Sequence, residues 1–151
     1  MDSDTPNIIE IPFLLQVEAQ IHPTEIKERI IAAIRNIFPN IELDVQSDWV
    51  LSKTKDWNDL IYFSELLEKQ RVLDAARRVI LSRMSADTTR FLLNKQAAYA
   101  GKINFCEMEE ESPMGPLFVV LSSKRIDELL DHIVPKWEWL RADRESSGRK
   151  R

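Results

Sequence analysis

The chain has 151 residues, of which 44% are apolar and 30% are charged, and its formal net charge is −4. This length suits a single domain that buries roughly 68–70% of its unfolded surface, and a pI near 5.3 argues against general coating of nucleic acid. The longest apolar runs are four or five residues, which excludes a membrane-spanning helix of ~20 residues.

The number of cysteines and the N-terminal residues indicate where in the cell the protein is located. Cys106 is the single cysteine, so no internal disulfide can form, which favours a reducing environment. The start, Met1-Asp2-Ser3-Asp4, lacks the positive charge and apolar run of a signal peptide. We therefore expect a soluble, cytoplasmic protein.

The first third of the chain switches from a two-residue to a helical apolar period. Apolar residues alternate over 9–21, which predicts a half-buried strand whose pairing begins after Pro12. Isoleucines at helical spacing then predict a helix over 24–37, capped by Thr24. Alternation returns over 41–46 and predicts a second strand.

Residues 59–84 have a helical composition, but their apolar residues do not form one stripe. The apolar side chains of 60–67 and of 72–80 fall on nearly opposite sides of a continuous helix. A straight helix would not bury both sets, so we predict helices over 59–68 and 71–84 with a break between them. Asp59 is the predicted cap of the first helix.

The remaining elements follow from the same periods. We predict strands over 89–93, 102–107 and 117–121, a helical turn over 94–100 that Gly101 ends, and a helix over 124–134. Together these elements predict an α+β fold, a mixed, mostly antiparallel sheet with helices packed on one face. Residues 7–135 form the predicted domain, and 136–151 form a basic, partly disordered C-terminal tail.

Charge reverses sign in the middle of the chain. Residues 69–102 hold eight basic and two acidic residues, so this block carries +6 while the rest of the chain carries −10. A basic surface on an acidic body suggests an anionic partner.

Residues 73–121 carry a recognisable pattern. It comprises Leu73-Asp74-Ala75-Ala76-Arg77, Thr89, Leu93-Asn94-Lys95-Gln96-Ala97-Ala98, Gly101-Lys102, Phe105-Cys106-Glu107 and Glu110-Glu111-Ser112-Pro113-Met114-Gly115-Pro116. The pattern resembles a family of small archaeal proteins of unassigned function, commonly labelled RNA-binding. The resemblance implies a fold like that of the fifth large-subunit ribosomal protein, and it implies RNA binding.

The sequence supports no catalytic or metal centre. Glutamates at 107 and 109–111 follow Cys106 and disfavour its thiolate, so a buried structural thiol is the better interpretation. With one cysteine and two histidines, the chain lacks the ligands of a tetrahedral zinc site. No glycine-rich phosphate loop occurs. We therefore expect no cofactor, no metal and no enzymatic activity, although a small enzyme with a phosphorylated substrate near Lys95 remains a third, weaker alternative.

The favoured function is non-catalytic RNA binding, directed at RNA structure rather than at a base sequence. Basic side chains would contact phosphates, amide groups between two strands would reach phosphates or base edges, and Tyr99 would stack on a base or lie in the core. The predicted contact residues are Arg71, Arg78, Asn94, Lys95, Gln96 and Lys102. The alternatives are a solvated basic surface without a ligand, and a protein–protein interaction module, such as a homodimer paired through an exposed strand edge.

Overall fold

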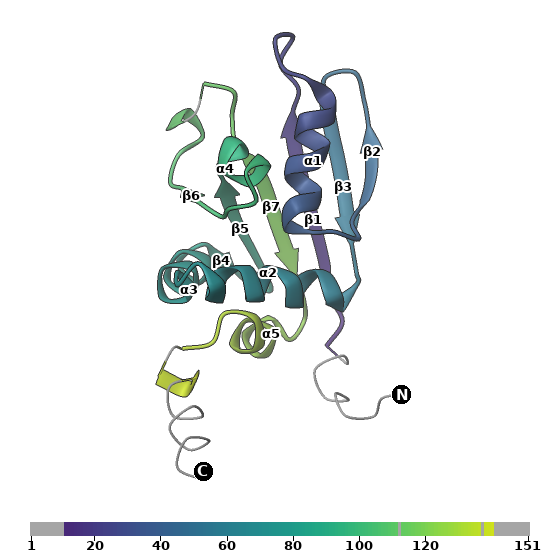
Figure 1. Ribbon diagram of the computed structural model, residues 1–151. Helices are drawn as coiled ribbons and strands as arrows, with labels where there is room; N and C mark the ends of the chain where they lie inside the picture. The colour runs from purple at the N-terminus through teal and green to yellow at the C-terminus, as the bar shows by residue number, and fades with distance from the viewer. Residues whose placement is uncertain (1–10, 112, 137, 141–151) are drawn as a thin grey trace.

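The computed structural model describes residues 11–111, 113–136 and 138–140. Figure 1 shows the arrangement of its elements. The strands are β1 (Leu14–Gln20), β2 (Glu42–Val45), β3 (Trp49–Thr54), β4 (Met84–Ser85), β5 (Thr88–Leu93), β6 (Phe105–Cys106) and β7 (Leu117–Ser122). The helices are α1 (Lys27–Ile37), α2 (Trp57–Lys69), α3 (Leu73–Ser82), α4 (Lys95–Tyr99) and α5 (Ile126–Ile133), with a 3₁₀ turn at Glu109–Glu111.

The strands join in one sheet with the order β2-β3-β1-β7-β5-β4, and β6 pairs with β5 beside this path. Each of these pairings is antiparallel. The predicted α+β class with an antiparallel sheet is therefore confirmed. The central strand β1 pairs with β3 on one side and with β7 on the other.

One face of the sheet is covered by helices. Along β1 the alternate residues Leu15, Val17 and Ala19 are buried, whereas Gln16 and Glu18 between them are exposed. Figure 1 shows α1, α2 and α4 in front of the strands, with α5 below α2. The predicted packing of helices on one face is confirmed, and the opposite face of the sheet is open.

A row of aromatic rings ties the helices to the sheet. Phe38 follows α1, Phe63 lies on α2 and Phe91 lies on β5. The ring centroids of Phe38 and Phe63 are 5.3 Å apart, and those of Phe63 and Phe91 are 6.1 Å apart. All three side chains are fully buried, so this row is a major part of the apolar burial that stabilises the fold.

The break between α2 and α3 lies where the two apolar stripes predict it. The chain turns at Arg71, whose φ is +62°, a left-handed conformation that costs a residue with a side chain roughly 1–2 kcal/mol. The turn lets Leu67 on α2 and Ala76 on α3 enter the same core. The predicted division into two helices is confirmed.

Both predicted helix caps in the first half of the chain are wrong. Helix α1 begins at Lys27 after Ile26, which makes no side-chain cap, so Thr24 lies outside the helix. Helix α2 is capped by Asp56, whose carboxylate accepts a hydrogen bond from the backbone N–H of Asn58. The predicted cap Asp59 is instead fully buried and accepts from the backbone N–H of Asn40.

Two strands are shorter than predicted. Strand β1 starts at residue 14, in keeping with pairing that begins after Pro12, and residues 9 and 10 lie outside the described ranges. The strand predicted over 102–107 is reduced to β6, because the preceding backbone is held by α2 rather than by the sheet.

The described part of the C-terminal segment packs on the domain. Leu140 lies against the core, and the indole of Trp139 lies 5.4 Å from the guanidinium carbon of Arg77. Residues 137 and 141–151 of the predicted tail lie outside the described ranges. Among the described residues, no helix has both the length and the apolarity needed to cross a bilayer.

Candidate nucleic-acid interface

The six predicted contact residues fall into two groups in the structure. Four are exposed, namely Arg71, Arg78, Gln96 and Lys102. The other two are held by the fold itself. Asn94 is half-buried and Lys95 is only 4% exposed.

Lys95 joins three separate segments of the chain. Its Nζ donates to the carbonyl oxygens of Gln20 at 2.8 Å and Met114 at 2.7 Å, and to the carboxylate of Glu25 at 3.1 Å. These three partners satisfy the three N–H donors of the ammonium. The expectation that Lys95 presents its charge to a phosphate is therefore corrected, because no donor is left over and the side chain is buried.

Asn94 is a helix cap rather than a surface amide. Its Oδ1 accepts a hydrogen bond of 2.8 Å from the backbone N–H of Ala97, which stabilises the first turn of α4. Its backbone N–H donates to the carbonyl of Asn104. The Asn94 oxygen is thus occupied at the start of α4, and a contact of its amide N–H groups with RNA stays a prediction.

Two residues that are distant in the sequence, Arg71 and Lys102, are brought together by Gln70. The Gln70 side chain accepts a hydrogen bond from the backbone N–H of Ile103 at 2.9 Å and donates to its carbonyl at 3.2 Å. Gln70 immediately precedes Arg71, and Ile103 immediately follows Lys102. This reciprocal pair therefore fixes the backbone that carries one exposed cation to the backbone that carries the other.

Helix α4 continues this surface toward α1. The amide of Asn36 on α1 donates to the carbonyls of Ala98 at 3.0 Å and Tyr99 at 2.9 Å. Tyr99 is 48% exposed, and the guanidinium carbon of Arg29 lies 5.7 Å from the centroid of its ring. Sequence reasoning missed Arg29 because it lies 70 residues before Tyr99 and outside the basic block.

These residues define what we call the helix-face strip: Arg71, Lys102, Gln96, Tyr99 and Arg29. It runs from the α2–α3 break across the end of α4 to the start of α1. Four of its members are among the exposed polar residues, and one offers an aromatic face. The strip therefore combines cationic and stacking groups, the two kinds that bind unpaired nucleic acid.

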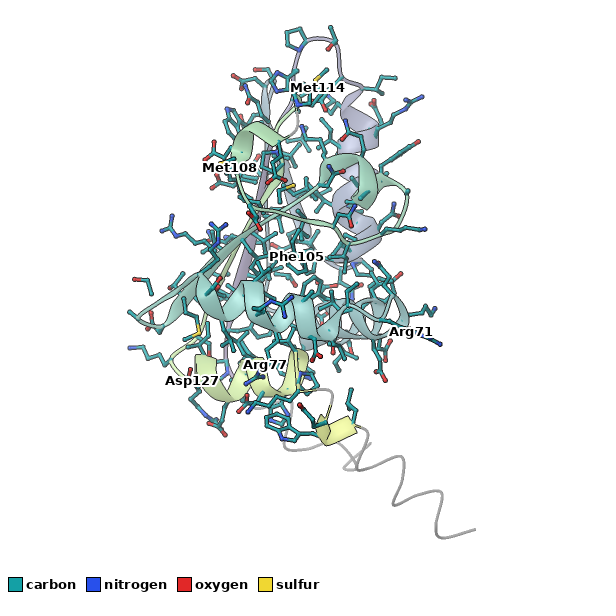
Figure 2. All side chains as sticks on the ribbon, turned by 90° about the vertical axis from the view of Figure 1, so that its left-hand side faces the viewer. Arg71, Arg77, Phe105, Met108, Met114 and Asp127 are labelled. Carbon is teal, nitrogen blue, oxygen red and sulfur yellow. The ribbon has the colours of Figure 1, made fainter. Side chains whose placement is uncertain are left out.

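Other cations of the basic block lie elsewhere. Arg77 donates to the carbonyl of Val134 and pairs with Asp131 at 3.0 Å, and Figure 2 shows it beside α5, away from Arg71. Arg83 donates to the carbonyl of Glu107. Arg90 belongs to the open face of the sheet. The +6 charge of the block is thus spread over several surfaces.

A hollow of about 670 Å³ adjoins the strip at the α2–α3 break. Its lining carries charges of both signs and two leucines, one of them in the C-terminal segment described above. The lining residues are Glu65, Glu68, Lys69, Arg71, Leu73, Asp74 and Leu140. Because three carboxylates oppose two cations, the hollow itself is not an anion pocket, and we place phosphate contacts outside it.

Cys106 has the environment of a structural thiol. It is 4% exposed, and burial, followed by the nearby charge of Glu111, raises the pKa of its thiol. A raised pKa leaves the sulfur protonated and unreactive near neutral pH. Within the described residues, no group of three or more acidic, histidine or cysteine side chains is arranged to hold a metal ion.

Comparison with known proteins places the chain in a family. The family model described as RNA binding matches residues 15–124, a range that contains the whole helix-face strip. A UPF0201 protein of Sulfolobus acidocaldarius is 34% identical over 124 residues, which cover 80% of this chain and 86% of that protein. A UPF0201 protein of Methanothermobacter thermautotrophicus is 35% identical over 121 residues, covering 80% of this chain and 90% of its own.

Solved structures show the same fold. The crystal structure of a UPF0201 protein from Methanococcus jannaschii matches with a TM-score of 0.71 at 34% identity, covering 82% of this chain and 93% of that one. A further UPF0201 crystal structure matches with a TM-score of 0.72 at 35% identity, covering 82% of this chain and 94% of that one.

Proposed function

This chain belongs to the family of archaeal UPF0201 proteins whose model is described as RNA binding, and on that premise we propose that it binds RNA through the helix-face strip without catalysing a reaction. The recognised feature is the conformation of the RNA, including its unpaired nucleotides, rather than a base sequence. The implied likeness to the fifth large-subunit ribosomal protein is part of this proposal.

The observation that carries the proposal is the reciprocal hydrogen bonding of Gln70 with Ile103. It fixes the backbone next to Arg71 to the backbone next to Lys102, although these two cations are separated by 31 positions in the sequence. Two exposed cations on backbone that is already ordered bind phosphates at a lower entropic cost than two cations on mobile segments.

Lys69 and Arg78 extend the cationic surface. Lys69 ends α2 and lines the hollow together with Arg71. Arg78 is exposed on α3, one turn beyond Asp74 of the same hollow. We assign phosphate contacts to Lys69, Arg71, Arg78 and Lys102.

The experiment is an anisotropy titration of a fluorescent single-stranded RNA at several salt concentrations. Four phosphate contacts give a slope of log K against log salt of roughly −3, at about −0.7 per contact. Arg71→Ala and Lys102→Ala each flatten that slope by about one contact. Lys53→Ala and Arg90→Ala, which remove the same charge from the open face of the sheet, leave it unchanged.

Two results would contradict the proposal. The first is flattening by the Lys53 and Arg90 variants in place of the strip variants, which would move the interface to the open face. The second is absence of binding below about 100 μM RNA at 50 mM salt, where non-specific nucleic-acid binders already register.

Assembly with a second copy is the other candidate function, and the open face of the sheet favours it over the strand edge. The exposed edge strand β2 carries two outward carboxylates, Glu42 and Asp44, which disfavour pairing of two such edges. The open face instead carries apolar side chains on the strands that flank β1, with Phe118 and Val120 half-buried and Leu51 40% exposed, while β1 between them contributes Gln16 and Glu18.

Charges on the open face are arranged so that two copies would complement each other. Five paired residues form a row across the open face, one from each of five neighbouring strands with β1 in the middle. From β5 to β2 they are Arg90, Val120, Gln16, Lys53 and Glu42. A two-fold axis along β1 would bring Arg90 of one copy opposite Glu42 of the other. Glu18, also on β1, would then face its own copy, which opposes this arrangement.

A further inference from the structure

A second, smaller hollow lies between the start of α1 and the short helix α4. Its volume is about 270 Å³, near the lower end of the range for small-ligand sites. The lining residues are Thr24, Glu25, Ile26, Arg29, Ile30, Lys95, Gln96, Tyr99 and Met114. Three of these, Arg29, Gln96 and Tyr99, belong to the helix-face strip, so the hollow opens on the strip itself.

The aromatic wall of this hollow is held in place at both ends of its helix. Asn94 caps the first turn of α4, and the amide of Asn36 binds the carbonyls of Ala98 and Tyr99 at the end. Arg29 lies over the ring of Tyr99. A ring that is 48% exposed yet fixed on a pinned helix is a stacking surface that loses little entropy on binding.

The floor of the hollow is electrically neutral. Lys95 and Glu25 both line it, and they form an ion pair of 3.1 Å with side chains only 5% and 13% exposed. Because each charge already has its partner, the floor offers no free cation to a phosphate and no free carboxylate to a metal ion.

The walls are apolar and the rim is polar. Ile26 is 50% exposed although its side chain is large and apolar, and Met114 stands on the far wall. The exposed groups of Gln96 and Thr24 at the hollow can donate and accept hydrogen bonds. The lining also holds the guanidinium of Arg29, which lies over the Tyr99 ring. Together, the aromatic face, the apolar side chains and the neutral polar groups match a planar heterocycle with hydrogen-bonding edges.

We propose that this hollow takes one unpaired nucleobase of the bound RNA, stacked on Tyr99 with its edge toward Gln96, while the adjoining phosphates lie toward Lys102. This inference rests on the proposed function. It adds that the protein prefers RNA with at least one unstacked nucleotide, because a base within a continuous duplex is paired and stacked and does not enter a pocket.

The test compares two RNA probes of equal length, a single strand of mixed sequence and a fully paired hairpin stem closed by a non-nucleotide linker. Tyr99→Ala lowers the affinity for the single strand by roughly 5- to 100-fold, the effect of losing one stacked base. Tyr99→Phe retains the ring and retains the affinity. Tyr62→Ala is the control, because Tyr62 is also exposed (39%) but lies on α2 outside the strip. We expect this variant to bind both probes with unchanged affinity.

The salt slope separates this inference from the proposed function. Tyr99→Ala leaves the slope unchanged, because it removes no phosphate contact. If Tyr99→Ala binds the single strand as tightly as the original protein, or weakens both probes equally, the base pocket is overturned while the phosphate contacts stand. If the unaltered protein binds neither probe, both proposals fall together.

Discussion

At the residue scale, the ion pair of Lys95 and Glu25 is a structural clamp. It fastens the end of β1, the turn before α1 and the segment at Met114 to the start of α4. Removing one partner of a buried pair leaves an uncompensated charge, at a cost of about 3–5 kcal/mol. The shape of the proposed nucleobase pocket therefore depends on this ion pair, which lines the pocket.

We expect Lys95→Ala to lower the free energy of unfolding by about 3 kcal/mol, as measured by urea titration. The slope of RNA affinity against salt stays the same in this variant, because Lys95 contacts no phosphate. Lys102→Ala is the matched control, with the opposite pattern of unchanged stability and a flatter slope. A flatter slope in the Lys95 variant would contradict the assignment of this residue to the interior.

Contacts within the fold explain why the charge of residues 69–102 did not reveal which of its basic side chains share one surface. Among its members, Lys95 is buried, Arg77 is paired beside α5 and Arg90 lies on the open sheet face. Charge counts report how many cations a segment holds, but the direction of each side chain depends on the packing of its backbone.

At the element scale, the break between α2 and α3 connects folding to the interface. The left-handed conformation of Arg71 turns the chain so that both apolar stripes reach one core. The same turn leaves the guanidinium exposed next to Gln70 and Lys102. A strained residue at a candidate binding site is consistent with a functional reason for retaining a side chain there.

We expect Arg71→Gly to raise the free energy of unfolding by up to about 1 kcal/mol, because glycine adopts a positive φ without strain. The same variant loses one phosphate contact. Ala86, whose φ is +56° in the turn between β4 and β5, supplies the control. Ala86→Gly relieves comparable strain without altering RNA affinity. Thermal unfolding and anisotropy titration measure the two effects, and equal RNA affinities for both variants would refute the role of Arg71.

At the scale of the whole molecule, the sheet separates two surfaces of different chemistry. The helix-covered side carries the strip with its cations and aromatic ring, and the open side carries apolar side chains together with charges of both signs. RNA binding and self-association would therefore occupy opposite sides and would not exclude each other.

If the open face joins two copies, we expect Arg90→Glu to dissociate the dimer, because it would place like charges opposite each other at Glu42. Light scattering across a concentration series measures the molar mass of both proteins. Arg78→Glu, which makes the same change on α3, is the control. A monomer at all concentrations in the unaltered protein would exclude this candidate.

Periodicity in the sequence by itself predicted most of the elements and their order, but the predicted strands did not include β3 or the short strand β4. A two-residue period reports a half-buried strand and a 3.6-residue period reports a helix, and the change of apolar stripe near residue 70 predicted the break between α2 and α3. Local chemistry was less informative about boundaries. Asp56 rather than Asp59 caps α2, because the burial of Asp59 against Asn40 is a tertiary contact.

Only the tertiary structure decided which polar residues share a surface. The bond between Gln70 and Ile103 and the contact between Arg29 and Tyr99 join positions 33 and 70 residues apart. No one-dimensional period encodes such pairs, because they depend on how helices pack across the sheet. The same packing buries Lys95 and leaves Tyr99 exposed. The charge of the sequence therefore predicted an anionic partner, whereas the packing of the fold decided which residues are exposed to bind it.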